Sequence, residues 1–148
     1  MANQEARRDA VEEVMTAVMS GQIGTIARHF YPGAVVSQRS NAALSSEPWF
    51  ERMEGEFQLR GETETRAFIE ELLKRSSYLT FELRGVICEG DEAASRCDWS
   101  RRDENSGALV TGTTMYWFAF TGDDRIRSLE TLGAIHSVIP MKRAQNDA

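Results

Sequence analysis

The sequence predicts an α+β fold, because helical patterns come first and strand patterns follow. Apolar residues recur at helical spacing over residues 4–20 and again over 62–76. From residue 78 to 136 the chain has alternating, β-rich segments separated by short turn signals. Together these patterns indicate helices packed on one face of a curved, mostly antiparallel sheet.

Three helices are expected before the sheet. The first covers 4–20 and ends at Ser20-Gly21, and a short second helix covers 22–30. A short strand follows over 34–37. The third helix, over 62–76, has acidic residues in its first turn and basic residues in its last, as the helix dipole favours.

Residues 39–60 form a long excursion, an insertion or a lid. A helix start near Pro48 would place Trp49, Met53 and Phe57 on one face. Such a stripe is typical of a helix that only covers the core, although a lid over a ligand is the alternative. The tail, 140–148, is expected to be flexible.

Four strands form the second half of the chain. Gly90-Asp91 has the form of a two-residue hairpin loop, and two further loops contain glycine. The expected strands are 78–89, 92–103, 109–120 and 125–136, with the later loops at Asn105-Ser106-Gly107 and Gly122-Asp123-Asp124.

The composition argues against several partners. The chain has 148 residues, a formal net charge of −6 and a pI near 5. Nucleic acids and anionic membranes attract basic surfaces, and no apolar run approaches the ~18 residues of a membrane span. We expect one domain over 1–148, with neither a nucleic acid nor a membrane as partner.

Metal and cofactor sites have no sequence signature. The two cysteines, Cys88 and Cys97, lack a Cys-x-x-Cys partner, and the chain has only two histidines. No glycine-rich phosphate loop follows a strand. The N-terminus is charged and does not resemble a signal peptide. We therefore expect a cytoplasmic protein with neither a metal nor a cofactor.

The strongest candidate for chemistry is Arg96-Cys97-Asp98, whose two charged side chains share one face of a strand. A two-residue Gly90-Asp91 loop pairs Glu89 with Glu92. That register sets Leu83 opposite Asp98, so the charged pair lies on the apolar face that the helices cover. A slip of one residue would reverse this interpretation.

The later hairpins bring further residues to the same face. Tyr116 is expected opposite Arg96, and Glu130 opposite Tyr116, with Phe118 and His136 nearby. The opposite face keeps many apolar residues, too many for open solvent. We therefore expect a homodimer through the outer sheet face. The apolar residues expected on that outer face are Trp99, Met115, Trp117, Leu129 and Ile135.

This order of elements, with Arg60-Gly61 before the third helix, resembles the NTF2-like superfamily over about residues 5–136. That cone-shaped fold is shared by SnoaL-like polyketide cyclases, ketosteroid isomerase and limonene epoxide hydrolase. Arg96-x-Asp98 and Glu130 resemble the epoxide hydrolase pattern of an acid, a bridging arginine and a water-activating carboxylate. The tyrosine and asparagine that hold water in that family are replaced by Val36 and Gln38.

The resemblance implies a cofactor-independent enzyme acting on a hydrophobic small molecule by general acid/base chemistry. Epoxide opening, isomerisation and polyketide cyclisation all stay open, and in the cyclase pattern Asp98 and His136 would serve. A non-catalytic ligand-binding or dimerisation module is the alternative. The expected catalytic residues are Asp98, Arg96 and Glu130, and the expected substrate contacts are Tyr116, Phe118, Leu83, Trp49 and His136. The charged run 101–104 is interpreted as a solvated turn.

Overall fold

The computed structural model describes residues 2–40, 55–75, 78–103 and 106–141. Helices precede the long strands, as the sequence predicts. The first half contains α1 (Ala2–Ser20), α2 (Ile23–Ala27), β1 (Phe30–Ser40), β2 (Gly55–Gln58) and α4 (Gly61–Arg75). The second half contains β3 (Tyr78–Glu89), β4 (Glu92–Arg102), β5 (Leu109–Phe120) and β6 (Ile126–Ile139).

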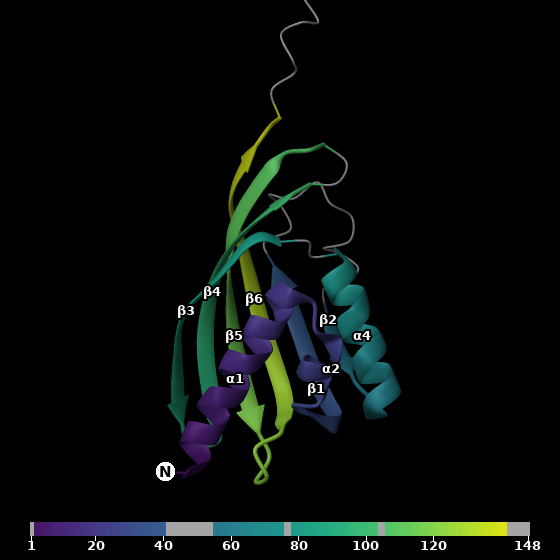
Figure 1. Ribbon diagram of the computed structural model, residues 1–148, viewed down its shortest axis with the longest axis vertical. Helices are drawn as coiled ribbons and strands as arrows, with labels where there is room; N and C mark the ends of the chain where they lie inside the picture. Colours follow the sequence, from purple (N-terminus) through teal and green to yellow (C-terminus); the bar gives the residue numbers. More distant parts are fainter. Residues whose placement is uncertain (1, 41–54, 76–77, 104–105, 142–148) are drawn as a thin grey trace, which may run out of the picture.

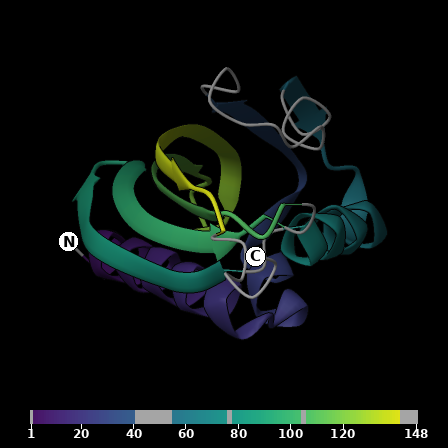
Figure 2. The same cartoon turned by 90° about the horizontal axis from the view of Figure 1, so that it is seen from above.

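Within the described ranges, six strands form one sheet in the order β2-β1-β6-β5-β4-β3. The pairs are antiparallel except for β1 with β6, which is parallel. The sheet curls strongly, and α1, α2 and α4 lie on its concave side (Figures 1 and 2). The α+β class and the helix-covered curved sheet are confirmed.

The core fills the space between these helices and the concave face. From α1, Val11 and Met15 are almost fully buried, and from the sheet Phe118, Phe120 and Ile126 are as well. None of the described helices is long and apolar enough to cross a membrane.

A β-bulge in β3 changes which residues of β3 lie opposite the residues of β4. The expected turn is present, since Glu89 lies opposite Glu92 and Gly85 opposite Arg96. Beyond Gly85 the register shifts, and Leu83 lies opposite Cys97 instead of Asp98. One extra residue reverses the alternation of a strand.

The bulge overturns the expected face. Val86 on one side of it and Leu83 on the other both pack against the core, whereas Ile87 is 74% exposed. The apolar residues of β3 therefore do not share a single alternation. The helices cover the face that carries Cys97, and Arg96 and Asp98 lie on the outer face.

The next hairpin is also shifted by one residue. The backbone N–H of Asp103, rather than Glu104, bonds the carbonyl oxygen of Ala108, at 2.9 Å. Tyr116 consequently lies opposite Ser95, and Met115 lies opposite Arg96. The predicted pairing of Tyr116 with Arg96 is wrong because Ala108 pairs one residue earlier on β4 than assumed.

A bulge near Phe120 shifts the last hairpin. Ala119 pairs with Ser128 and Phe120 with Ile126, so Glu130 lies opposite Trp117 and not Tyr116. Three residues expected on the outer face instead face inward: Trp99, Leu129 and Ile135.

The segment 39–60 is described only in part. Phe57, expected on a helix, lies in strand β2 and packs on Phe68 of α4 with ring centroids 5.3 Å apart. Trp49 and Met53 lie outside the described residues, as does the tail beyond Met141.

Candidate functional site

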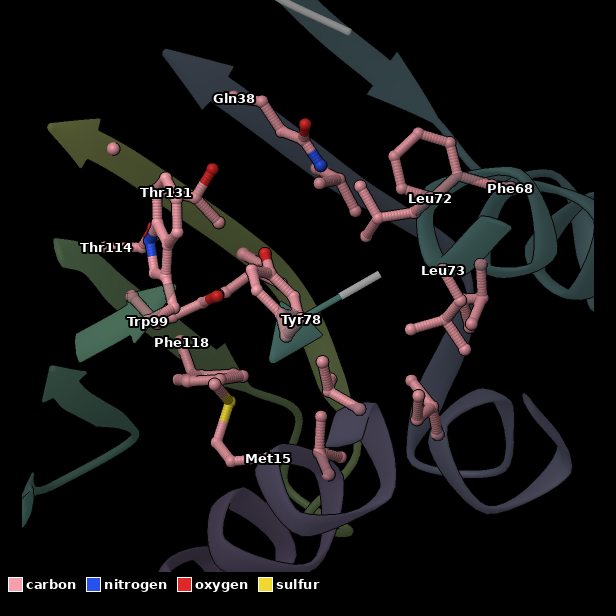
Figure 3. Close-up of a pocket in the computed structure, with 18 of the residues that line it drawn as sticks. Met15, Gln38, Phe68, Leu72, Leu73, Tyr78, Trp99, Thr114, Phe118 and Thr131 are labelled. Atoms are coloured by element: carbon pink, nitrogen blue, oxygen red, sulfur yellow. The ribbon is translucent and has the colours of Figure 1, made fainter. Parts of the chain in front are cut away.

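A cavity of about 130 Å³ lies between the concave face of the sheet and the helices. Figure 3 shows side chains of α4 facing those of the long strands across it, with Met15 of α1 on a third side. The apolar lining is Val14, Met15, Val18, Ile26, Phe30, Val36, Phe68, Ile69, Leu72, Leu73, Phe118, Leu129 and Ile135. The remaining lining residues are Gln38, Arg39, Tyr78, Trp99, Arg101, Thr114, Tyr116, Thr131 and Gly133.

A chain of hydrogen bonds crosses the sheet wall of the cavity. The indole Nε1 of Trp99 donates to Thr114 Oγ1 at 2.9 Å, and the Thr114 hydroxyl bonds the Tyr116 phenol. Thr114 thereby links side chains from β4 and β5. The indole N–H and the phenol, which are costly to bury alone, are both satisfied.

The phenol of Tyr116 stays protonated over a wide pH range. Burial raises its pKa well above the ordinary value, and the neighbouring Tyr78 adds to this effect. The residue is half-buried and borders the cavity. A neutral phenol can donate a hydrogen bond to a ligand.

Arg101 contributes a positive charge to the cavity lining. The residue is only 4% exposed, and its guanidinium carbon lies 5.6 Å from the centre of the Trp99 ring. The sequence interpretation as a solvated turn is wrong for both Arg101 and Asp103, which are buried. Alternation places Arg101 on the same face as Trp99, two residues earlier, but that face was expected to point outward.

Gly112 makes room for the Trp99 indole. A Cβ atom on Gly112 would lie 2.5 Å from Trp99 Cζ2 and 2.6 Å from the carbonyl oxygen of Ala134. Such distances are far below van der Waals contact. A residue without a side chain is therefore needed at this position for the indole to reach Thr114.

Two further polar residues line the cavity. Gln38 of β1 pairs in register with Thr131 of β6, and the side chains of both reach the lining. Gln38 is the residue that the resemblance placed at a water-holding position. Tyr78, at the start of β3, packs against Trp99 with ring centroids 5.8 Å apart.

The predicted catalytic pair, Arg96 and Asp98, is not in this cavity. The two side chains do meet, with Arg96 Nε 3.2 Å from Asp98 Oδ1, but on the outer face, where they are 55% and 33% exposed. The pKa of Asp98 is lowered, first by a hydrogen bond from the Thr113 hydroxyl and then by Arg96 and Arg84. A general acid at neutral pH needs a raised pKa instead.

The other predicted residues divide between the two faces. Tyr116 and Phe118 line the cavity as expected. Glu130 and His136 are exposed on β6, where His136 Nε2 lies 2.7 Å from Thr113 Oγ1. Leu83 packs against the core outside the described cavity lining, and Trp49 lies outside the described residues.

The described lining of the cavity contains no aspartate, glutamate or histidine. Across the described ranges, no three His, Cys, Asp or Glu side chains form a cluster that could hold a metal ion. The described lining combines hydrogen-bond donors and positive charge with a majority of apolar side chains.

Comparisons with known proteins identify the fold. Residues 11–129 match the family model of the SnoaL-like domain. No match is found among the curated proteins. The family match confirms the expected resemblance to the NTF2-like superfamily.

Solved structures share this fold at low sequence identity. A Bacillus subtilis protein provisionally assigned as an isomerase has 13% identity and a TM-score of 0.69, covering 90% of this chain and 89% of that one. The epoxide hydrolase/cyclase-like enzyme SalBIII, with a role in pyran ring formation in salinomycin, has 14% identity and a TM-score of 0.68, covering 95% and 100%. A provisionally assigned polyketide cyclase from Sinorhizobium meliloti has 24% identity and a TM-score of 0.57, covering 83% and 93%.

Proposed function

This chain belongs to the SnoaL-like domain family, and we propose that its cavity binds a hydrophobic small molecule and catalyses a cofactor-independent isomerisation or cyclisation. One observation carries the proposal. An apolar cavity has the Trp99–Thr114–Tyr116 hydrogen-bond chain and the buried Arg101 together in its lining. Similar folds in an isomerase-type and a cyclase-type protein support the same class of reaction.

The polar groups fit a reaction that develops negative charge on oxygen. When water takes a proton from the carbon next to a carbonyl group, the C–H electron pair forms the C=C bond of the enolate and the carbonyl oxygen becomes an oxyanion. Return of a proton from water to another carbon restores the carbonyl group and completes the isomerisation. The neutral phenol of Tyr116 would donate a hydrogen bond to that oxygen, and Arg101 would stabilise its charge. Because these groups are largely buried, both interactions would be stronger than they are in bulk water.

The size of the cavity limits the substrate. A cavity of about 150 Å³ in another protein binds benzene, and the present one has about 130 Å³. We expect a single ring, or a compact terpenoid or polyketide fragment, to occupy it. Opening an epoxide or closing a ring on such a fragment fits the same space.

Non-catalytic ligand binding is the second candidate, and one observation favours it. The described lining contains no carboxylate or imidazole that could act as the general base. Under this candidate the cavity and its donors serve only recognition.

The isomerisation of 3-cyclohexen-1-one to 2-cyclohexen-1-one tests both candidates. The reaction moves a proton from C2 to C4, needs no cofactor, and can be followed by the absorbance of the conjugated ketone. Ligand-observed NMR measures binding of the same ketones. The enzyme candidate predicts turnover that Tyr116→Phe lowers by about 10²-fold or more, the loss that follows removal of an oxyanion donor.

Tyr31→Phe is the matched control, since Tyr31 is an exposed tyrosine on β1. It should leave turnover unchanged. Binding of the ketones without turnover would support the second candidate, and the absence of both would contradict the proposed cavity function.

A further inference from the structure

We propose that the ligand of this cavity carries a carboxylate and that the Arg101 guanidinium binds it. The inference rests on the proposed function of the cavity and goes further by giving the charge of the ligand. It predicts an amphiphilic anion, with an apolar ring or chain against the helices and an oxygen pair at Arg101.

The described lining of the cavity is positively charged. Arg39 and Arg101 are the charged residues among the described lining, and Arg101 is nearly fully buried whereas Arg39 is exposed. A guanidinium keeps its positive charge at any physiological pH. Arg101 already has a contact within the protein, but a guanidinium has five N–H donors, so others are left to bind an anionic ligand. Because the residue is almost fully buried, little water screens this charge.

The other polar side chains do not oppose this preference. Burial keeps the Tyr116 phenol protonated, so it brings no negative charge to the cavity. Gln38, Thr114 and Thr131 are neutral. Each of them can add a hydrogen bond to an anion but cannot repel it.

The position of Arg101 suits a carboxylate in particular. Its guanidinium lies over the Trp99 ring, a contact that restricts how the planar group can turn. The N–H bonds of a guanidinium lie in its plane, and two parallel ones match the two oxygens of a carboxylate. The apolar lining of the same cavity, which includes Leu72 and Ile135, suits the hydrophobic remainder of the ligand.

Benzoate and benzamide provide the direct comparison, because they share one ring and differ in charge. Titration calorimetry at neutral pH measures their dissociation constants against the wild-type chain. We expect benzoate to bind at least about tenfold tighter, which corresponds to one charge-assisted hydrogen bond. Equal affinities, or a preference for benzamide, would overturn the inference.

Arg101→Met and Arg102→Met are matched variants on adjacent residues. Arg102 is exposed, and its Nη1 bonds only the carbonyl oxygen of Gly107 among the described contacts. Arg101→Met should lose the preference for benzoate, and Arg102→Met should keep it. A loss of the preference in both variants would contradict a specific role for Arg101.

Two controls separate the possible failures. Circular dichroism shows whether Arg101→Met folds, and if it does not, the wild-type ratio of the two affinities decides the question alone. Benzyl alcohol tests the cavity without charge. If benzyl alcohol binds and benzoate does not, the carboxylate inference fails while the cavity stands. If none of the three probes binds, both proposals fail.

Discussion

The indole of Trp99 reaches Thr114 only because position 112 has no side chain. Gly112→Ala should therefore lower the free energy of unfolding by about 1–3 kcal/mol, the usual cost of overpacking a core. Its new Cβ would meet both the indole and a backbone carbonyl oxygen, which cannot move away. Chemical denaturation measures the effect.

Gly122→Ala is the control for this substitution. Gly122 is an exposed turn residue, and a Cβ atom added to it would have no other atom within 4 Å. The substitution should change the free energy of unfolding by less than about 0.5 kcal/mol. Equal effects of the two substitutions would contradict the packing role of Gly112.

Because of Cys97, the free energy of unfolding should depend on pH in the alkaline range. Burial raises the pKa of its thiol from 9.0 to about 12, with a smaller contribution from the charge of Asp98. Between these values the unfolded chain loses the thiol proton and the folded chain keeps it. The contribution of this thiol to the free energy of unfolding is therefore fully present below pH 9 and is lost as the pH rises toward 12.

Cys97→Ala should flatten this dependence. We expect the slope of the unfolding free energy between pH 9 and 10.5 to become less negative, by at most about 1.4 kcal/mol per pH unit. Cys88→Ala, at a partly exposed thiol, should change the slope less. An unchanged slope in Cys97→Ala would show that the thiol ionises equally in both states.

Helix α1 is tied to two hairpin turns by one arginine. Arg7 Nε lies 2.8 Å from Asp124 Oδ1, and its other nitrogens donate to the carbonyl oxygens of Gly90 and Thr121, at 2.6 and 3.2 Å. Arg7→Met should lower the free energy of unfolding by about 2–4 kcal/mol, because several buried charge-assisted bonds are lost. Urea denaturation tests this.

Arg8→Met is the neighbouring control on the same helix. Arg8 is exposed and bonds one carbonyl oxygen, that of Val86. It should cost no more than about 1 kcal/mol. If Arg7→Met cost as little as Arg8→Met, the ties to the two turns would contribute little to the fold.

The positions of most elements could be predicted, because turn signals and apolar periodicity are local, but strand β2 was expected to be part of a helix. The four long strands begin and end within a few residues of the predicted bounds. The faces of those strands depend on bulges, and a single extra residue exchanges them. Gly85, in the interior of β3, marked one bulge in the sequence, since glycine inside a strand often signals one.

The candidate site could be predicted in part for the same reason. Tyr116 and Phe118 were expected in the cavity and lie there. Arg96 and Asp98 were expected there too, but they lie on the outer face because the register differs from the predicted one. Arg101 was missed because a run of charges near a turn is usually solvated. Its burial depends on Trp99 and the helices, which no local pattern reveals.

The outer face of the molecule leads to a prediction about assembly, and a second copy of this chain is the partner that we propose. The face keeps exposed apolar side chains, including Trp117 at 49% and Leu132 at 58% exposure. Its charges are of mixed sign, with Arg96 beside Asp98, so two copies could oppose opposite charges. A face with charges of one sign would repel the same face of a second copy.

Leu132→Glu should therefore shift the chain from dimer to monomer in sedimentation velocity. The new carboxylate would lose its water in the dimer contact, which costs free energy, whereas in the monomer it would stay exposed to water at little cost. Met19→Glu, on an exposed position of α1, should leave the assembly unchanged. A wild-type chain that stays monomeric at high concentration would contradict the proposal.

The inner cavity, and not the outer Arg96–Asp98 pair, is the binding site that we propose. Two tryptophans report on the two faces. The Trp99 indole N–H donates to Thr114 in the cavity wall, and the Trp117 indole N–H lies 3.3 Å from Glu92 on the outer face. Their ¹H–¹⁵N signals can be assigned with Trp99→Phe and Trp117→Phe.

Titration with benzyl alcohol, followed through these two indole signals, is the most direct measurement. We predict a saturable shift of the Trp99 signal, because the probe enters the space beside its ring, while the Trp117 signal stays in place. A saturable shift of the Trp117 signal with an unchanged Trp99 signal would contradict this assignment and place the site on the outer face.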